Sequence, residues 1–101
     1  MEMTYKRTDR ELTVFVSGEL DHHAARSVME SIDRLIDQNL PVRTTLDFNG
    51  LTFMDSSGIA VLLRAKRRLD ELEGQFTVQG IPVQPRKVLD AAGVGRIIRL
   101  K

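Results

Sequence analysis

The chain has 101 residues, a length typical of one domain, and 42% of them are hydrophobic, which is enough for one small core. Its 15 Lys and Arg against 14 Asp and Glu leave a formal net charge of +1, which provides no strong field for binding nucleic acid. The absence of Cys excludes disulfides, zinc–thiolate sites, iron–sulfur clusters and thiol nucleophiles. The first residues contain no apolar signal segment, and no apolar run approaches the ~18 residues that span a bilayer, so we expect a cytoplasmic protein.

The first part of the chain predicts a hairpin followed by a helix. Residues 3–6 and 11–17 flank a polar turn and carry strand-like hydropathy, so they predict two antiparallel strands. Apolar residues then recur at helical spacing, which predicts an amphipathic helix over 22–38. Asp21 can cap this helix, because its carboxylate can accept hydrogen bonds from the free N–H groups of the first turn. Pro41 cannot continue the helix.

The second part predicts a regular alternation of strands and helices. In chain order we expect a strand over 44–48, a turn at Asn49-Gly50, a helix over 59–72, a strand over 76–79, a helix over 85–92 and a strand over 96–100. The complete order is β-β-α-β-α-β-α-β. It predicts an α/β fold with a mixed, mostly parallel sheet and crossover helices.

Functional residues of such sheets lie at the carboxyl ends of the strands, which here are the segments 18–23 and 49–58. The second segment contains Asp55-Ser56-Ser57-Gly58 at the start of a predicted helix. Asp and Ser are common helix caps, so a purely structural interpretation is available. A glycine behind two serines would also let the backbone of another molecule approach closely. This combination favours a serine that is modified by an outside enzyme.

Catalytic, metal and nucleotide sites are not predicted. The only histidines, His22 and His23, lie in the other segment, and no Gly-x-Ser-x-Gly motif is present for a nucleophilic serine. Adjacent histidines at a helix start point in different directions, so we expect exposed or hydrogen-bonding side chains without a metal. No Gly-rich phosphate loop is present, so no cofactor is expected.

The helix over 59–72 offers a candidate docking surface. Its expected core-facing residues are Ile59, Leu62, Leu63, Leu69 and Leu72. Gly58, Val61 and Ala65 lie beside that stripe, so they predict either a flat docking surface or a wider buried face under the last helix. Arg64 and Arg68, one turn apart, either bracket an acidic partner or line a solvated face.

Two segments together resemble one protein family. They read GELDHHAA over 18–25 and LTFMDSSGI over 51–59. Joined at this spacing, they are similar to the STAS-domain anti-sigma factor antagonists, and most similar to the sporulation sigma F branch. The resemblance covers essentially the whole chain and implies a single STAS domain over 1–101.

The resemblance implies a partner-switching regulator without enzymatic activity. The unphosphorylated antagonist binds an anti-sigma factor that is also a serine kinase, and so releases a sigma factor. The kinase supplies ATP and phosphorylates the antagonist, and a serine phosphatase resets it. Ser56 matches the phosphoacceptor, with Ser57 as the alternative, and Asp21 matches an aspartate implicated in kinase contact. The expected partner surface consists of Asp21, His22, His23, Asp55, Ser57, Gly58, Ile59, Val61, Arg64, Ala65 and Arg68.

Two other functions remain open at this stage. One is a STAS subunit of another partner-switching system, such as the general stress response, a lipid-transport component or a stressosome-like scaffold. The unfused length and the paired histidines argue against the last two. The other is a small nucleotide-binding protein or hydrolase, which would rest only on two serines, two histidines and several acids. We expect a monomer with no direct contact to nucleic acid or membrane.

Overall fold

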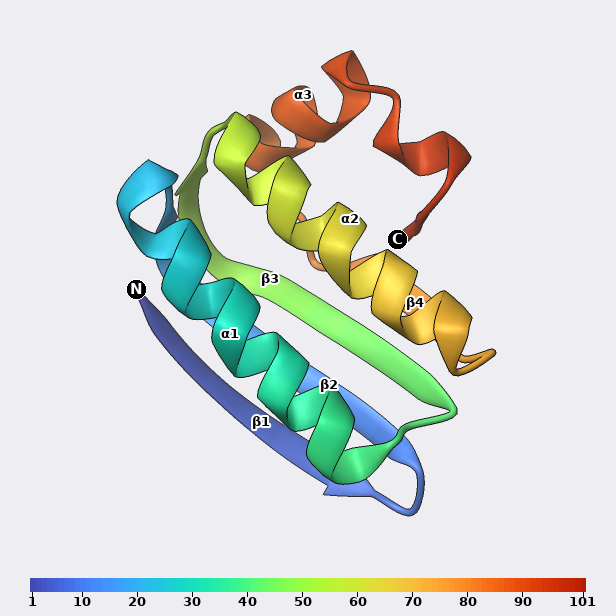
Figure 1. Ribbon diagram of the computed structural model, residues 1–101. Coiled ribbons are helices and arrows are strands. Elements are labelled where there is room, and N and C mark those ends of the chain that lie inside the picture. Colours follow the sequence, from blue (N-terminus) through green and yellow to red (C-terminus); the bar gives the residue numbers. More distant parts are fainter.

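The computed structural model describes residues 1–101 as a five-stranded sheet packed against helices (Figure 1). In chain order the elements are β1 (Glu2–Thr8), β2 (Glu11–Leu20), α1 (His22–Asn39), β3 (Arg43–Met54), α2 (Ser56–Glu71), β4 (Gln75–Gln79), α3 (Val83–Ala91), the short 3₁₀ helix η1 (Val94–Arg96) and β5 (Arg99–Leu100). The strands lie in sequence order, with β1 antiparallel to β2 and the others parallel. The predicted fold class and element order are confirmed, although η1 shortens the predicted last strand to two residues.

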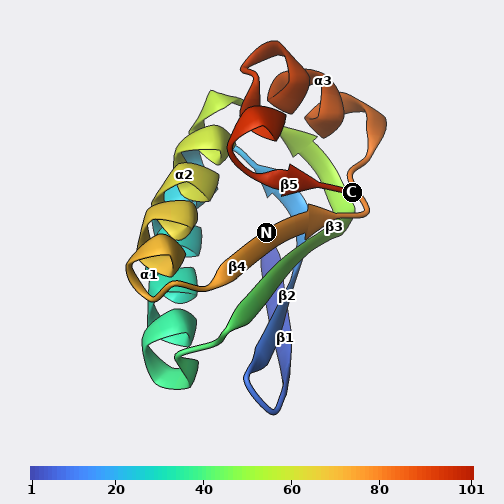
Figure 2. The same cartoon turned by 90° about the vertical axis from the view of Figure 1, so that its right-hand side faces the viewer.

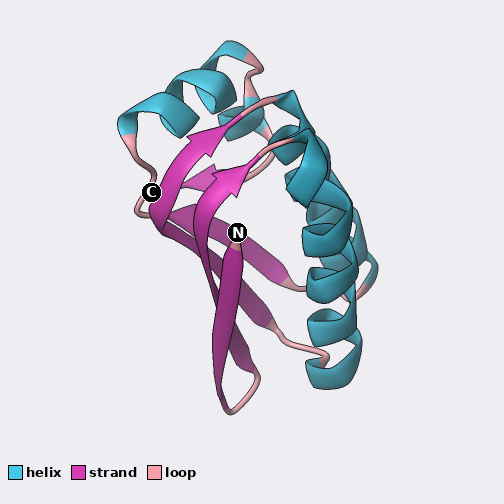
Figure 3. Cartoon of the chain, turned by 90° about the vertical axis from the view of Figure 1, so that its left-hand side faces the viewer, coloured by secondary structure: helices cyan, strands magenta, loops and turns pink.

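The two long helices, α1 and α2, lie side by side on one face of the sheet, and α3 lies at the end of the sheet where β3 ends (Figures 1 and 2). From β2 to β4 each parallel connection steps to the next strand in the same direction, so right-handed crossovers place α1 and α2 on the same face. Figure 3 shows that neither long helix covers the opposite face. No helix is long and apolar enough to cross a lipid bilayer.

The hydrophobic core lies between the sheet and these two helices. Alternate strand residues point into it, as the pleat of a β-strand requires. Its fully buried side chains include Leu12, Val14, Leu20, Leu46, Phe48, Met54 and Val78 from the strands, and Ile32, Ile36, Leu62 and Leu69 from the helices.

The buried face of α2 differs from the predicted one. Its buried residues are Gly58, Val61, Leu62, Ala65 and Leu69. Leu63 and Leu72 of the predicted stripe are 41% and 38% exposed. Of the two alternatives for Gly58, Val61 and Ala65, the docking surface is therefore wrong and the wider buried face is confirmed, because these residues face the core. α1 and the sheet, rather than α3, pack against α2, and small side chains allow that close approach.

The predicted turn at Asn49-Gly50 is also wrong, because both residues lie inside β3. The register between β2 and β3 shifts twice along this segment, and each time β3 carries one extra residue as a β-bulge. The backbone and side-chain N–H groups of Asn49 both donate to Asp47 Oδ1 at 2.9 Å, a local geometry typical of turns. The hydrogen-bond ladder to β2 nevertheless keeps the chain extended.

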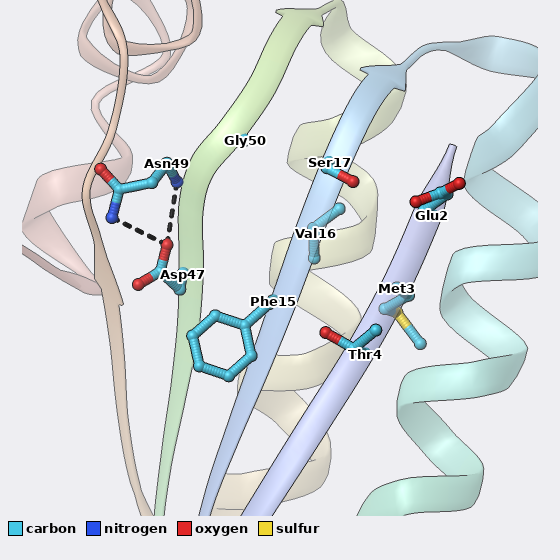
Figure 4. Close-up of a pocket in the computed structure, with 9 residues that line it drawn as sticks. All are labelled: Glu2, Met3, Thr4, Phe15, Val16, Ser17, Asp47, Asn49 and Gly50. Carbon is cyan, nitrogen blue, oxygen red and sulfur yellow. Dashed lines mark hydrogen bonds between the residues drawn. The ribbon is translucent and has the colours of Figure 1, made fainter.

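Asp47 is a buried carboxylate on the face of the sheet away from α1 and α2 (Figure 4). Besides the two bonds from Asn49, its Oδ2 accepts a hydrogen bond from Gln79 Nε2 at 3.1 Å. Burial by itself raises the pKa of Asp47. The hydrogen bonds from the Asn49 backbone, the Gln79 side chain and the Asn49 side chain together outweigh burial and lower that pKa below 3.8.

We expect Asp47→Asn to lower the free energy of unfolding by about 1–3 kcal/mol at neutral pH, because the NH2 group that replaces one carboxylate oxygen would face an N–H donor, from Gln79 or from Asn49. A lowered pKa means that the carboxylate stabilises the fold above its unfolded pKa and stops doing so as the pH falls through the folded pKa. The difference from the wild type should therefore shrink below pH 3.8. Urea unfolding at several pH values measures it. Asp70→Asn, at an exposed position, is the control, and an Asp47→Asn effect independent of pH would contradict the prediction.

Candidate functional site

Two aspartates each form the whole connection between a strand and a helix. Asp21 lies between β2 and α1, and Asp55 lies between β3 and α2. The two predicted loops are therefore reduced to one residue each, because their other residues belong to strands or helices. Leu20 pairs with Met54 in the parallel ladder, so Asp21 and Asp55 follow neighbouring strand ends at one edge of the sheet. The two candidate segments thus meet in space.

Each aspartate caps the helix that follows it. Asp21 Oδ1 accepts hydrogen bonds from the backbone N–H groups of the second and third residues of α1, at 3.0 and 3.1 Å, which confirms the predicted cap. Asp55 Oδ1 accepts from the Ser57 N–H at 2.8 Å. Asp55 Oδ2 accepts from the His22 N–H at 3.2 Å, so this one carboxylate joins the first turns of both helices.

Ser56 is the first residue of α2, and it is exposed at the surface. It directly follows Asp55, whose bond to the His22 N–H sets the serine beside the start of α1 as well. The start of a helix is the positive end of its dipole and favours a negatively charged group. Ser57 is half-buried, with its N–H held by Asp55, so it is less accessible than Ser56.

Gly58 is enclosed by side chains of the chain's own core. A Cβ at this position would lie 2.4 Å from Met54 Cγ, 2.7 Å from Met54 Sδ and 3.2 Å from Leu20 Cδ2. The predicted role of Gly58 in admitting another molecule is therefore wrong. The missing side chain instead lets the first turn of α2 pack closely on the ends of β2 and β3.

The paired histidines lie exposed in the first turn of α1, as predicted. The ring centroids of His22 and His23 are 5.3 Å apart, in an edge-on arrangement. No cluster of three or more His, Cys, Asp or Glu side chains that could hold a metal ion is present.

The acidic groups that Arg64 and Arg68 contact belong to this chain. Arg64 Nε and Nη2 both lie 2.8 Å from Asp33 Oδ2, and Arg68 pairs with Asp37, so the ion pairs link α2 to α1. The hydrogen bond to Asp33 and the charge of its carboxylate raise the pKa of Arg64. The prediction that Arg64 and Arg68 bracket an acidic partner is therefore wrong. The two arginines instead connect α2 to α1.

The structure thus divides the predicted partner surface into two parts. The residues that gather around Ser56 at the two helix starts are Asp21, His22, His23, Asp55 and Ser57. The residues engaged elsewhere are Gly58, Val61 and Ala65 in the core, Ile59 partly buried against it, and Arg64 and Arg68 in ion pairs.

Sequence reasoning missed one polar residue at this site, Gln84 of α3. Its Oε1 accepts from the Met54 N–H and its Nε2 donates to the Met54 carbonyl, both at 2.8 Å. Met54 immediately precedes Asp55, so α3 contacts the backbone that leads into the site. No local pattern around Gln84 predicts this contact, because it depends on where α3 lies relative to the end of β3.

The surface pockets lie away from Ser56. One of about 250 Å³ lies on the helix-free face around Phe15, Asp47 and Asn49 (Figure 4). A second of about 280 Å³ lies beside Asp33 and Arg64, and a third of about 370 Å³ lies at the start of β4.

We expect Asp55→Ala to lower the free energy of unfolding by about 1–2 kcal/mol, because it removes a helix cap and the link to the His22 N–H. Asp70→Ala, which removes an exposed carboxylate paired with Lys66 at 2.7 Å, should change it by less than about 0.5 kcal/mol. Thermal or urea unfolding of both variants measures the effect. Equal stabilities would show that the Asp55 carboxylate makes no net contribution.

The fold and the site define a small α/β domain in which two neighbouring helix starts lie beside an exposed serine. The chain belongs to the STAS domain family, which matches residues 2–101. An anti-sigma F factor antagonist of Lysinibacillus sphaericus is 32% identical over 95 residues, covering 94% of this chain and 79% of the relative.

Two solved structures are similar over nearly the whole chain. The anti-sigma factor antagonist SpoIIAA in its unphosphorylated form has a TM-score of 0.84 at 28% identity, covering 99% of this chain and 88% of that one. The Bacillus cell fate determinant SpoIIAA in the phosphorylated form has a TM-score of 0.75 at 28% identity, covering 99% and 91%. The resemblance to anti-sigma factor antagonists is thereby confirmed.

Proposed function

We propose that this chain is an anti-sigma factor antagonist controlled by phosphorylation of Ser56. In its unphosphorylated form it binds an anti-sigma factor that is also a serine kinase, and the sigma factor is released. The kinase inactivates it by transferring the γ-phosphoryl group of ATP to Ser56, and a serine phosphatase removes the phosphate. The chain itself works as a monomer, needs no cofactor and performs no catalysis.

The observation that carries the proposal is the exposed Ser56 at the start of α2, directly after Asp55, in a fold similar to that of SpoIIAA. SpoIIAA has been solved in both unphosphorylated and phosphorylated forms. The relative at 32% identity is an anti-sigma F factor antagonist, which favours a sporulation regulator over the other STAS functions considered above.

The local electrostatics support a switch that does not require refolding. A phosphate adds about −1.5 to −2 of charge, which the helix start tolerates because of its dipole. The nearby carboxylates of Asp21 and Asp55 oppose that charge, and an unpaired charge buried against a partner is costly. A tenfold loss of affinity requires only about 1.4 kcal/mol, so a single phosphate is sufficient to separate the partners.

The partner contacts are proposed at the two helix starts. Asp21, His22, His23 and Ser56 lie at these helix starts, which the Asp55 carboxylate connects through its hydrogen bonds from the His22 and Ser57 N–H groups. Val61 and Ala65 are excluded from this proposed contact surface, since each is 2% exposed.

Phosphotransfer by a partner kinase tests the proposal. The purified chain is incubated with ATP and, one at a time, each anti-sigma factor kinase encoded in the same genome, and mass spectrometry locates the phosphate. We expect one kinase to modify the wild type and Ser57→Ala on Ser56, and to leave Ser56→Ala unmodified. Modification of Ser56→Ala at the wild-type rate would disprove the site, and no modification by any of the kinases would disprove the function.

A further inference from the structure

The strand that leads to Ser56 lacks a neighbour on one side. The ladder between β3 and β4 ends at the pair Asp47 and Gln79, whereas β3 continues to Met54. On its other side β3 stays paired with β2, up to Leu20 opposite Met54. The end of β3 therefore has one free edge, and backbone N–H and C=O groups left unpaired at such an edge cost stability.

The Gln84 side chain occupies that free edge at Met54. A carboxamide carries one N–H donor side and one carbonyl acceptor, the same pair that a peptide group of a neighbouring strand would offer. Gln84 uses both: Oε1 accepts from the Met54 N–H and Nε2 donates to the Met54 carbonyl, each at 2.8 Å. Through this one side chain, α3 thus provides at Met54 the two hydrogen bonds that a longer β4 would make.

The peptide group that precedes Asp55 is held from both sides as a result. Its carbonyl, from Met54, accepts from Gln84 Nε2 at 2.8 Å. Its N–H, from Asp55, donates to the Leu20 carbonyl at 3.3 Å. Only Asp55 lies between this fixed peptide group and Ser56, so the orientation of the peptide plane determines where α2 begins.

We propose that Gln84 is a positioning residue for Ser56: it fixes the peptide group between Met54 and Asp55 and thereby the position of the hydroxyl that accepts phosphate. This inference rests on the proposed function. Phosphoryl transfer depends on alignment of the attacking oxygen, and a displacement of about 1 Å can cost up to roughly 100-fold in rate. Gln84 lies on α3, outside the proposed contact surface, so its loss should affect the transfer step more than the docking step.

The test compares two half-buried glutamines replaced by a side chain of similar length without hydrogen bonds. Gln84→Met removes both bonds to Met54, and the matched control Gln79→Met removes the bond to Asp47 on the helix-free face. The partner kinase that modifies the wild type is assayed with each variant. We expect Gln84→Met to lower kcat about tenfold with KM within about twofold, and Gln79→Met to leave both values unchanged.

A second variant separates positioning from general loss of structure. Gln84→Glu keeps the size of the side chain and an acceptor for the Met54 N–H, but it sets a carboxylate oxygen against the Met54 carbonyl, so two acceptors repel each other and kcat should fall at least as far as in Gln84→Met. A wild-type kcat for the folded Gln84 variants, or an equal loss in Gln79→Met, would overturn the inference while the proposed function stands. Failure of every kinase to modify the wild type would overturn both.

Discussion

A Ser56→Asp variant is expected to bind the anti-sigma factor kinase at least about tenfold more weakly than the wild type while keeping its fold. The carboxylate mimics part of the phosphate charge at an exposed helix start, where the dipole tolerates it. When a partner covers Ser56, the new carboxylate loses its water next to the carboxylate of Asp55. Asp55 is itself negative and does not compensate the new charge. Calorimetric titration gives the affinity, and a thermal unfolding curve checks the fold.

The matched control for this variant is Thr8→Asp. Thr8 is the last residue of β1, at the opposite end of the sheet from Ser56, and it is exposed. Thr8→Asp therefore also replaces an exposed hydroxyl by a carboxylate, but far from the proposed contact surface. Its affinity for the kinase should stay within about twofold of the wild type. Equal weakening in Thr8→Asp would assign the effect to net charge, and an unchanged affinity in Ser56→Asp would contradict exclusion by local charge.

Local patterns in the sequence were sufficient to predict the element order and the cap of α1. Leu12, Val14 and Val16 alternate with less buried residues because β2 has one face on the core, and this period of two is visible in the sequence. The capping role of Asp21 was also predictable, since it depends only on the residues that follow it. These features share one property: each is decided by neighbours within a few positions along the chain.

The features that the sequence did not predict depend on how distant elements meet. Asn49-Gly50 has a turn-like local geometry, but pairing with β2 keeps it inside a strand. The buried stripe of α2 is centred on Val61 and Ala65 because α1 lies close beside it, and hydropathy favours the more apolar Leu63 instead. Gln84 reaches Met54 only because β3 extends past β4. Such contacts require the sheet register and the helix rotation to be known.

Gly58→Val is expected to lower the free energy of unfolding by about 3 kcal/mol, which for a domain of this size corresponds to roughly 10–20 °C in Tm. The new Cβ would stand 2.4 Å from Met54 Cγ, and Met54 is fully buried, so neither side chain has room to move away. The gain in helix propensity on replacing glycine is below about 0.5 kcal/mol for valine and does not offset the overlap. Chemical denaturation of both proteins measures the difference.

A double-mutant cycle separates this overlap from a general intolerance of the helix start. Shortening the opposing side chain in Met54→Ala/Gly58→Val makes room for the new methyl groups. The loss of unfolding free energy in the double variant should therefore be smaller than the sum of the two single losses by at least about 1 kcal/mol. Ala60→Val, on the exposed side of the same turn, should cost only about 0.5 kcal/mol. Strict additivity in the cycle would show that overlap with the Met54 side chain does not account for the loss of stability in Gly58→Val.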